Sequence, residues 1–419
     1  MRNKPRNDAI VPRVPRLSRY EGGGFLEYIG YNKPKVLPQP TFDEKDKYKL
    51  SNRILTYQFI KSYLDSNLNP NDCLTVKQFG DKTGYTIRDI VDLVEEFGSP
   101  SSTPLSVQIY KTRLNITNAE QFLIASKVRK GYFNKNDDET KIMKRITEEI
   151  IEKGLSKHFI IMYKSTLCVR GKIEIVDFNE LCDGDVENLV KKDEVRSNND
   201  TLFNILFQCF ISLATFNNMI GYTYDDAHSR NFLYQTNNEK GYYHYRFGDT
   251  SFYLKSCPYN ICLYDFGEVI QSINPFLIYS AYGRINNYEK IFSQTFNVNT
   301  HLTDYYMKNL NNPQFKILFF EEILRLMKEH SPSGMIVDKL PEGTVPLNEK
   351  PFIISNHKAV ANSSGGSLTK YISTGEHVHI VYKNKKLKRC VYRKTKGRGK
   401  YCKINKVYIL LSKLKLVDE

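Results

Sequence analysis

Two short segments carry the residue types that phosphoryl transfer from a nucleotide needs. In residues 224–233, Asp226 is followed five positions later by Asn231, and in residues 263–267, Asp265 ends an apolar run and begins the sequence Asp-Phe-Gly. A carboxylate can accept the proton of an attacking hydroxyl, while an amide oxygen and a second carboxylate can hold magnesium against the phosphates of ATP. We therefore predict Asp226 as the catalytic base, with Asn231 and Asp265 as magnesium ligands.

Two further residues suited to this chemistry lie upstream. Lys127 falls within a short apolar strand predicted over residues 122–128, and Glu139 begins a predicted helix with apolar residues along one face. A lone lysine on a strand is most often a solvated edge residue. A lysine followed about a dozen residues later by a helix glutamate can instead form an ion pair that positions the α- and β-phosphates. Glu148 and Glu149, further along the same helix, are the alternatives to Glu139.

The elements that position these residues follow from apolar periodicity. The spacing predicts helices over residues 53–69, 199–220 and 315–328, strands over 105–110, 158–163 and 172–178, and an aromatic hairpin over 241–254. Residues 85–97 fit a helix or a first strand, and the pattern does not decide between them. Together these elements predict an α+β fold.

As a set, these segments resemble the catalytic loop and the metal-binding loop of the protein kinase superfamily. The chain resembles most the divergent Ser/Thr protein kinases of large nucleocytoplasmic DNA viruses, such as the iridoviruses, over about residues 97–330. The resemblance lies in the Asp-Ala-His-Ser-Arg-Asn loop that starts at Asp226, in the tyrosine-rich hairpin that runs into Tyr-Asp-Phe-Gly, and in the missing Ala-Pro-Glu segment after it. It implies a bilobal kinase-like fold, ATP and Mg²⁺ as cofactors, and transfer of the γ-phosphate to Ser/Thr hydroxyls of protein substrates.

The resemblance also implies a nucleotide site built from several segments. A glycine-rich loop over the phosphates would include Gly98, although only one of the three expected glycines is present. The connection over residues 179–185 would bind adenine through its backbone and ribose through an acidic residue. The implied ATP-binding residues are Gly98, Lys127, Glu139, Glu180, Leu181 and Asp185.

Departures from the kinase pattern leave other functions open. Tyr224 and Asp225 precede the base where most kinases have His and Arg, so activity should not depend on phosphorylation of an activation loop. His228 stands where many Ser/Thr kinases have lysine, and a similar loop occurs in small-molecule phosphotransferases of the aminoglycoside or choline type, which are the first alternative. A catalytically inactive scaffold is the second, because the glycine loop is poor.

The charge is concentrated at the two ends of the chain. Of the net charge of +15, residues 370–419 carry +12 and residues 1–20 carry +5, which leaves the body near neutral. The tail interleaves cations with tyrosines on short predicted strands. An acidic protein or substrate surface is the favoured partner, nucleic acid is the second candidate, since this pattern suits phosphate contacts and base stacking, and a solvated sheet without a partner is the third. We predict a basic arm (1–40), a helical N-terminal extension (41–94), a kinase-like domain (95–335), a linker (336–369) and a basic β-rich tail (370–419).

Three observations bear on where the protein works. The longest apolar stretch, about residues 202–216, is interrupted by Asn and Gln and is shorter than the about 20 apolar residues of a membrane span. Residues 1–20 are basic and proline-punctuated and lack the apolar core of a signal sequence. The eight cysteines show no paired CxxC spacing, so we expect reduced thiols and a cytoplasmic location, in the host cytoplasm or the virion if the protein is viral.

Overall fold

The computed structural model describes residues 36–97, 106–116, 123–131, 138–170, 172–288, 290–296 and 299–356, together with the stretches 377–382, 385–393, 401–404, 407–410 and 415–416. The described residues form a mixed α+β protein, which confirms the fold class at that level. Gly98 and most of the arm predicted over residues 1–40 lie outside the described residues, so the predictions made for them stay predictions.

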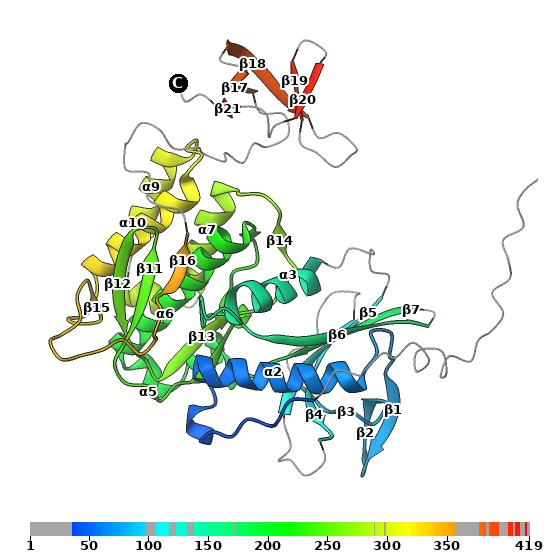
Figure 1. Ribbon diagram of the computed structural model, residues 1–419. Helices are drawn as coiled ribbons and strands as arrows, with labels where there is room; N and C mark the ends of the chain where they lie inside the picture. The colour runs from blue at the N-terminus through cyan, green and yellow to red at the C-terminus, as the bar shows by residue number, and fades with distance from the viewer. Residues whose placement is uncertain are drawn as a thin grey trace, which may run out of the picture.

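A seven-stranded antiparallel sheet forms the first part of the described fold (Figure 1). Short connections make consecutive strands antiparallel neighbours, and the order is β1-β2-β3-β4-β5-β7-β6. Residues 85–97, left open between helix and strand, lie in β2 and β3. The strands are β1 (Thr75–Phe79), β2 (Lys82–Ile87), β3 (Val91–Phe97), β4 (Ser106–Leu114), β5 (Leu123–Gly131), β6 (Met162–Arg170) and β7 (Lys172–Asn179).

The sheet curls so that its two edges meet at one end. Cys73, just before β1, is disulfide-bonded to Cys168 of β6, and their Cα atoms are 4.9 Å apart. Beside this bond the Leu167 N–H donates to the Pro70 carbonyl at 2.7 Å. The expectation that all thiols are reduced therefore differs from the structure. The curl joins two cysteines 95 residues apart in sequence, and no local spacing indicates such a pair.

Breaking this disulfide should destabilise the protein. Loss of a native disulfide typically lowers the stability of a folded protein by about 2–5 kcal/mol, and long loops such as this one lie toward the upper end. We expect Cys168→Ser to lower the free energy of unfolding by about that amount in a urea titration without reductant. Cys182→Ser, at a free cysteine, is the control. Equal stability of the wild-type protein with and without reductant would contradict the prediction.

Two helices pack against the sheet. Helix α2 (Leu50–Asn67) buries apolar residues such as Ile60 and Leu64, and its bounds agree with the helix predicted over residues 53–69. Helix α3 (Asp138–Ile146) continues as a π-helical segment over Thr147–Ile151. Its first turn carries Asp138 and Glu139, where acidic side chains interact favourably with the helix dipole.

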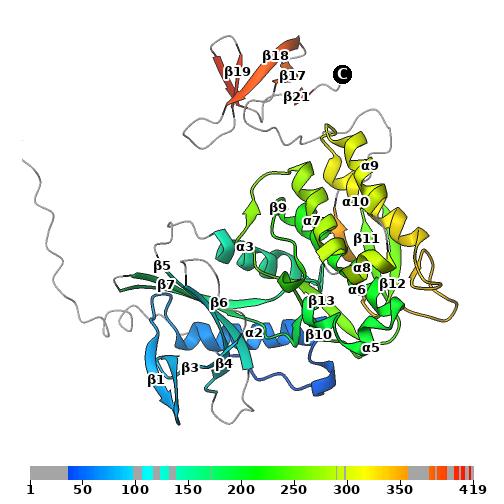
Figure 2. The ribbon, with the colours of Figure 1, turned by 180° about the vertical axis from the view of Figure 1, so that it is seen from behind.

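The second part of the fold is built around the buried helix α6, which continues as a π-helical segment over Phe216–Ile220 (Figure 2). Small sheets lie against it in the orders β13-β10-β8, β15-β12-β11-β16 and β14-β9. The helices are α4 (Val186–Leu189), α5 (Asp193–Arg196), α6 (Asn199–Thr215), α7 (Pro275–Tyr288), α8 (Lys290–Thr295), α9 (Asn299–Asn309) and α10 (Phe315–Glu329). The strands are β8 (Gly184–Asp185), β9 (Thr223–Tyr224), β10 (Phe232–Thr236), β11 (Tyr242–Phe247), β12 (Thr250–Lys255), β13 (Tyr259–Leu263), β14 (Val269–Ile270), β15 (Ile336–Val337) and β16 (Phe352–Ser355).

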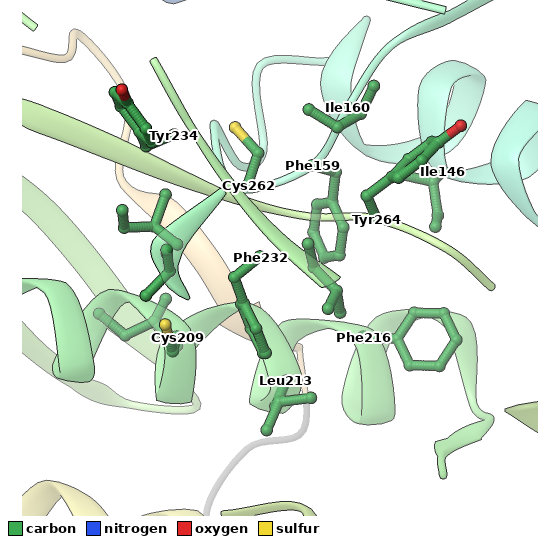
Figure 3. Close-up of a cluster of buried hydrophobic side chains, with 14 of the residues drawn as sticks. Ile146, Phe159, Ile160, Cys209, Leu213, Phe216, Phe232, Tyr234, Cys262 and Tyr264 are labelled. Atoms are coloured by element: carbon green, nitrogen blue, oxygen red, sulfur yellow. The ribbon is translucent and has the colours of Figure 1, made fainter. Parts of the chain in front are cut away.

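The core beneath the predicted catalytic segments is formed by α6. Figure 3 shows Phe232 of β10 pointing toward Cys209 and Leu213 of α6, and all three side chains are fully buried. By length and composition, the helix over Asn199–Ile220 also meets the requirements of a membrane span, although a shorter stretch was expected; 94% of its most apolar window is buried inside the protein. Buried core helices have the same composition, so length and apolarity alone do not distinguish the two.

The predicted boundaries of the central segments differ from the structure. The extension predicted as helical over residues 41–94 also contains β1, β2 and most of β3, because alternating residues there complete the seven-stranded sheet. The linker predicted over residues 336–369 contains β16, which pairs in parallel with β11 and buries Phe352 and Ile354. Pro and Gly residues surround this short apolar run in the sequence, and they indicated a linker instead of a strand. The strand predicted over residues 158–163 begins only at Met162.

The described C-terminal stretches form a five-stranded antiparallel sheet in the order β20-β19-β18-β17-β21. They are β17 (His377–Tyr382), β18 (Lys385–Arg393), β19 (Tyr401–Ile404), β20 (Val407–Leu410) and β21 (Lys415–Leu416). β17, β18 and β20 overlap the strands that residue alternation predicts over residues 378–382, 390–392 and 407–411, whereas β19 and β21 were not predicted.

Candidate functional site

One pair of strands brings Asn231 and Asp265 to the same place. Strand β10 begins directly after Asn231, β13 ends two residues before Asp265, and the two strands pair antiparallel with Phe232 opposite Leu263. Antiparallel pairing places the start of one strand beside the end of the other. The Tyr264 N–H donates to the Asn231 carbonyl at 2.9 Å and extends this contact to the predicted magnesium ligands.

Asp226 is held at the same end of this ladder. Its carboxylate accepts a hydrogen bond from the side-chain amide of Asn231 at 3.0 Å, and the same amide donates to the Asp226 carbonyl at 2.9 Å. His228 Nε2 lies 3.4 Å from Asp226 Oδ2. The hydrogen bond from His228 lowers the pKa of Asp226, with burial opposing it and Asn231 assisting it. The Asp226 side chain is 42% exposed, so a hydroxyl group can approach an ionised carboxylate.

Asp265 has a backbone conformation that few residues other than glycine adopt. Its φ is +56°, in the left-handed region. Such conformations persist where the surroundings enforce them, and they are concentrated at functional sites. The Tyr224 hydroxyl donates to the carbonyls of Tyr264 at 2.7 Å and of Asp265 at 2.8 Å. The next residue, Phe266, is buried and stacked on Phe216 with ring centroids 5.1 Å apart, so both sides of Asp265 are fixed.

Lys127 lies between Glu139 and Asp265. Its Nζ atom is 2.7 Å from Glu139 Oε1 and 2.8 Å from Asp265 Oδ1, and Lys127 and Glu139 are both buried. Burial alone would lower the pKa of Lys127, but the charges of Glu139 and Asp265 raise it above its ordinary value. Burial likewise opposes ionisation of Asp265, but the charge and hydrogen bond of Lys127 lower its pKa. Glu139, twelve residues away, and Asp265, 138 residues away, therefore meet at the buried ammonium group of Lys127.

A second cation, which sequence reasoning missed, supports Glu139 from behind. Arg129 Nη1 lies 3.1 Å from Glu139 Oε2, and the same guanidinium donates to the Asp177 carboxylate. The Thr140 hydroxyl accepts from Arg129 at 2.7 Å and donates to Asp177 at 3.0 Å. Residues i and i+2 of a strand share a face, so the spacing of Lys127 and Arg129 was the available indication.

The alternatives to Glu139 lie elsewhere on the same helix. Glu149 accepts hydrogen bonds from Arg145 at 3.0 and 3.1 Å, and Glu148 lies 3.8 Å from Lys144. Both glutamates are exposed. Glu139 is therefore the glutamate of this helix that the structure places at Lys127.

The acidic residues predicted to bind the nucleotide in residues 179–185 have other partners. The buried Glu180 carboxylate accepts two hydrogen bonds from Arg53, both at 2.7 Å. The two carboxylate oxygens of Asp185 accept from Asn188, from its N–H at 2.7 Å and its side chain at 2.9 Å, so Asp185 caps α4. Arg53 and Asn188 thus give these two carboxylates partners within the protein, and nucleotide binding at Glu180 and Asp185 stays a prediction.

Backbone groups of the connection over residues 179–185 also form hydrogen bonds within the protein. The Glu180 N–H donates to the Ile161 carbonyl at 2.8 Å, and the Leu181 carbonyl accepts a long hydrogen bond of 3.4 Å from the Tyr48 hydroxyl. These contacts fix the path of the connection. Binding of adenine by the backbone at Leu181 stays a prediction.

Asp225 is an acidic residue at the position where the kinase pattern has an arginine. Its negative charge is paired with an arginine of α7. Arg284 Nη2 donates to Asp225 Oδ1 at 3.0 Å. The Asp225 N–H donates to the Glu268 carbonyl at 3.1 Å, next to the pairing of β9 with β14. The segment after Gly267 is thus held to the segment around Asp225 by backbone and side-chain contacts. Independence from phosphorylation stays a prediction.

Two further observations concern ligand sites. Among the described residues, no group of three or more His, Cys, Asp or Glu side chains could hold a metal ion; the magnesium site predicted here has one carboxylate and one amide. A cavity of about 260 Å³ lies on the other side of α3, lined by Tyr57 of α2, Thr140 of α3 and Lys164 of β6 among others. This cavity is separate from the predicted catalytic residues, and none of them lines it.

Comparison with known proteins assigns no family to the chain. No protein-family model matches it, and no curated protein matches it. The convergence of residues 127, 139, 226, 231 and 265 in space is therefore the observation on which a function can be based.

Proposed function

We propose that the protein is an ATP-dependent phosphotransferase of the protein-kinase type, which transfers the γ-phosphate to Ser/Thr hydroxyls of proteins. The observation that carries the proposal is the contact of Lys127 with both Glu139 and Asp265, at 2.7 and 2.8 Å. Burying a lysine between two carboxylates is costly unless every charge is paired. A buried, paired lysine of this kind is suited to hold the phosphates of a nucleotide.

The bilobal fold is part of the same proposal. The seven-stranded sheet with α3 would form the smaller lobe, and the helices around α6 would form the larger one. The residues proposed for catalysis come from both parts, since Lys127 and Glu139 lie in the first and the two aspartates in the second. A nucleotide would then bind where the two parts meet.

The residues present fit a magnesium ion. Asp265 offers a carboxylate and Asn231 an amide oxygen, and oxygen atoms are the ligands that magnesium prefers. The Asn231 amide nitrogen donates to Asp226, an orientation that leaves its oxygen for the ion. When bound, magnesium would neutralise charge between the β- and γ-phosphates.

The protein residues would divide the remaining work. Lys127 would hold the α- and β-phosphates once it exchanges its contact with Asp265 for the nucleotide, and Glu139 would keep its ammonium group in place. Asp226, whose pKa is lowered chiefly by the His228 hydrogen bond, would orient the substrate hydroxyl and accept its proton. Positioning and electrostatics supply most of the rate gain in such enzymes.

A small-molecule phosphotransferase is the second candidate. The observation that favours it is the short segment between Gly267 and α7, which spans residues 268–274 and is held by β14 against β9. Such a segment offers little surface for a peptide beside Asp226. Incubation with labelled ATP would separate the two functions. Labelled protein supports the proposal, and label found only in small alcohols supports the second candidate.

A thermal-shift titration with ATP and Mg²⁺ tests the proposal most directly. A ligand at 100 times its Kd stabilises the folded state by about 2.7 kcal/mol, so we expect the unfolding midpoint of a chain of this length to rise by about 3 °C. Lys127→Met should lose most of this rise, and Lys130→Met on the same strand, whose amine lies 3.5 Å from Glu174, should keep it. If the unfolding midpoint of the wild-type protein does not rise with ATP and Mg²⁺, the proposal is wrong. A normal rise without phosphoryl transfer would favour the inactive scaffold.

A further inference from the structure

Arg53 of α2 is buried where the two parts of the fold meet. Its side chain is 1% exposed. The guanidinium donates from Nε and Nη2 to the two carboxylate oxygens of Glu180, each at 2.7 Å. Such fork-like pairing of arginine with a carboxylate fixes the geometry of both groups.

The same guanidinium also binds a second segment. Arg53 Nη1 donates to the Lys157 carbonyl at 2.8 Å, and Nη2 donates to the Phe159 carbonyl at 2.6 Å. Phe159 forms a parallel bridge with Leu263, two residues before Asp265. Arg53 therefore links residue 180, through Phe159, to the strand that ends two residues before the predicted magnesium ligand Asp265.

Tyr48, just before α2, adds a second contact to the connection. Its hydroxyl donates to Asp183 Oδ1 at 2.8 Å. The other oxygen of Asp183 accepts from the N–H and the hydroxyl of Thr236 in β10, at 2.7 and 2.8 Å. Residues 180–183 are thus held by the α2 region on one side and by β10 on the other. In both ribbon views α2 runs from the side of α5 to the side of β1 (Figures 1 and 2).

We propose that α2 is a fixed brace of the nucleotide site and that Arg53 is a positioning residue for ATP. This inference rests on the proposed function. Arg53 binds residue 180, in the connection that would contact the adenine. Through Phe159 it also supports Leu263, next to the residues that would contact the phosphates. In this arrangement the Glu180 carboxylate serves the brace through its two hydrogen bonds from Arg53. The brace acts on nucleotide binding more than on the protein substrate, since its contacts lead to Asp265 and not to the exposed face of Asp226.

The test compares Arg53→Met with Leu64→Ala in the full-length chain. Leu64 is fully buried in the same helix, and its truncation costs stability without removing a contact to residues 180–183. At a temperature where both variants are folded, we expect Arg53→Met to raise the KM for ATP about tenfold, because small misplacements of binding groups are costly. The KM for the protein substrate should stay within about twofold. Arg53→Lys, which keeps the charge but not the fork, should lie between wild type and Arg53→Met.

Hydrogen exchange of the amides in residues 179–185 gives a readout that does not need activity. We expect faster exchange there in Arg53→Met than in Leu64→Ala. If Arg53→Met does not fold, Tyr48→Phe removes only the hydroxyl bound to Asp183 and should raise exchange and the KM for ATP in the same direction, by about twofold. If Arg53→Met exchanges faster but the wild-type protein transfers no phosphate, the structural role of Arg53 is supported and the proposed phosphotransferase function is wrong. Equal exchange and equal KM for ATP in the Arg53 and Leu64 variants would overturn the brace.

Discussion

Replacing Asp226 by Asn is expected to lower the kcat of phosphoryl transfer by about 10²–10⁴-fold, the range that a general base supplies. An amide cannot take the proton of the attacking hydroxyl. The fold should tolerate the change, because the side chain is 42% exposed and neutralising it leaves no buried charge unpaired. The rise in the unfolding midpoint with ATP and Mg²⁺ should persist, since Lys127, Asn231 and Asp265 are retained. This single variant therefore separates the binding of ATP and Mg²⁺ from the step of phosphoryl transfer.

Asp249→Asn is the matched control for this prediction. Asp249 lies exposed in the turn between β11 and β12, so its substitution removes the same charge far from the predicted site. Its kcat should equal that of the wild type within about twofold. A kcat for Asp226→Asn within about tenfold of the wild-type value would remove Asp226 from the role of base.

The segments around the proposed chemistry could be predicted because their information is local. Asp226 and Asn231 lie in one loop, and an apolar run ending in Asp265 predicts a strand that delivers a carboxylate at its end. Lys127 and Glu139 are twelve residues apart, on a strand and on the helix that follows it. In each case one element or one connection sets the geometry, so spacing in the sequence becomes spacing in the fold.

The contacts that could not be predicted join distant segments. Arg53 and Glu180 are 127 residues apart, and an arginine on a helix gives no indication of which carboxylate it will meet. The same holds for the disulfide between Cys73 and Cys168. Glu180 and Asp185 were assigned to the nucleotide because the resemblance to kinases places adenine and ribose along residues 179–185. The fold also gives each carboxylate a partner within the protein.

Lys157 is a buried lysine whose pKa should govern how stability depends on pH. The residue is 6% exposed, and its Nζ atom lies 3.3 Å from the centroid of the Tyr243 ring. Burial lowers the pKa of Lys157 to about 7; the charges of Glu239 and two cysteines oppose this effect, and Arg53 adds to it. Between pH of about 7 and 10.5, the unfolded chain binds a proton at this lysine and the folded chain does not. Stability should therefore rise with pH across that window, by about 1.4 kcal/mol per unit from this group.

Lys157→Met tests this linkage, because methionine keeps an unbranched side chain at this buried position and carries no charge. We expect the variant to gain stability over the wild type as pH falls from about 10 to 7. The difference should change by about 4 kcal/mol over those three units and level off below pH of about 7. Urea titrations at fixed pH values measure it, and Lys308→Met, at an exposed position of α9, should run parallel to the wild type. If the stability of Lys157→Met instead had the same pH dependence as that of the wild type, the prediction would be wrong. The Lys157 amine would then keep its proton in the folded protein, where the ring of Tyr243 would bind it as an ammonium ion.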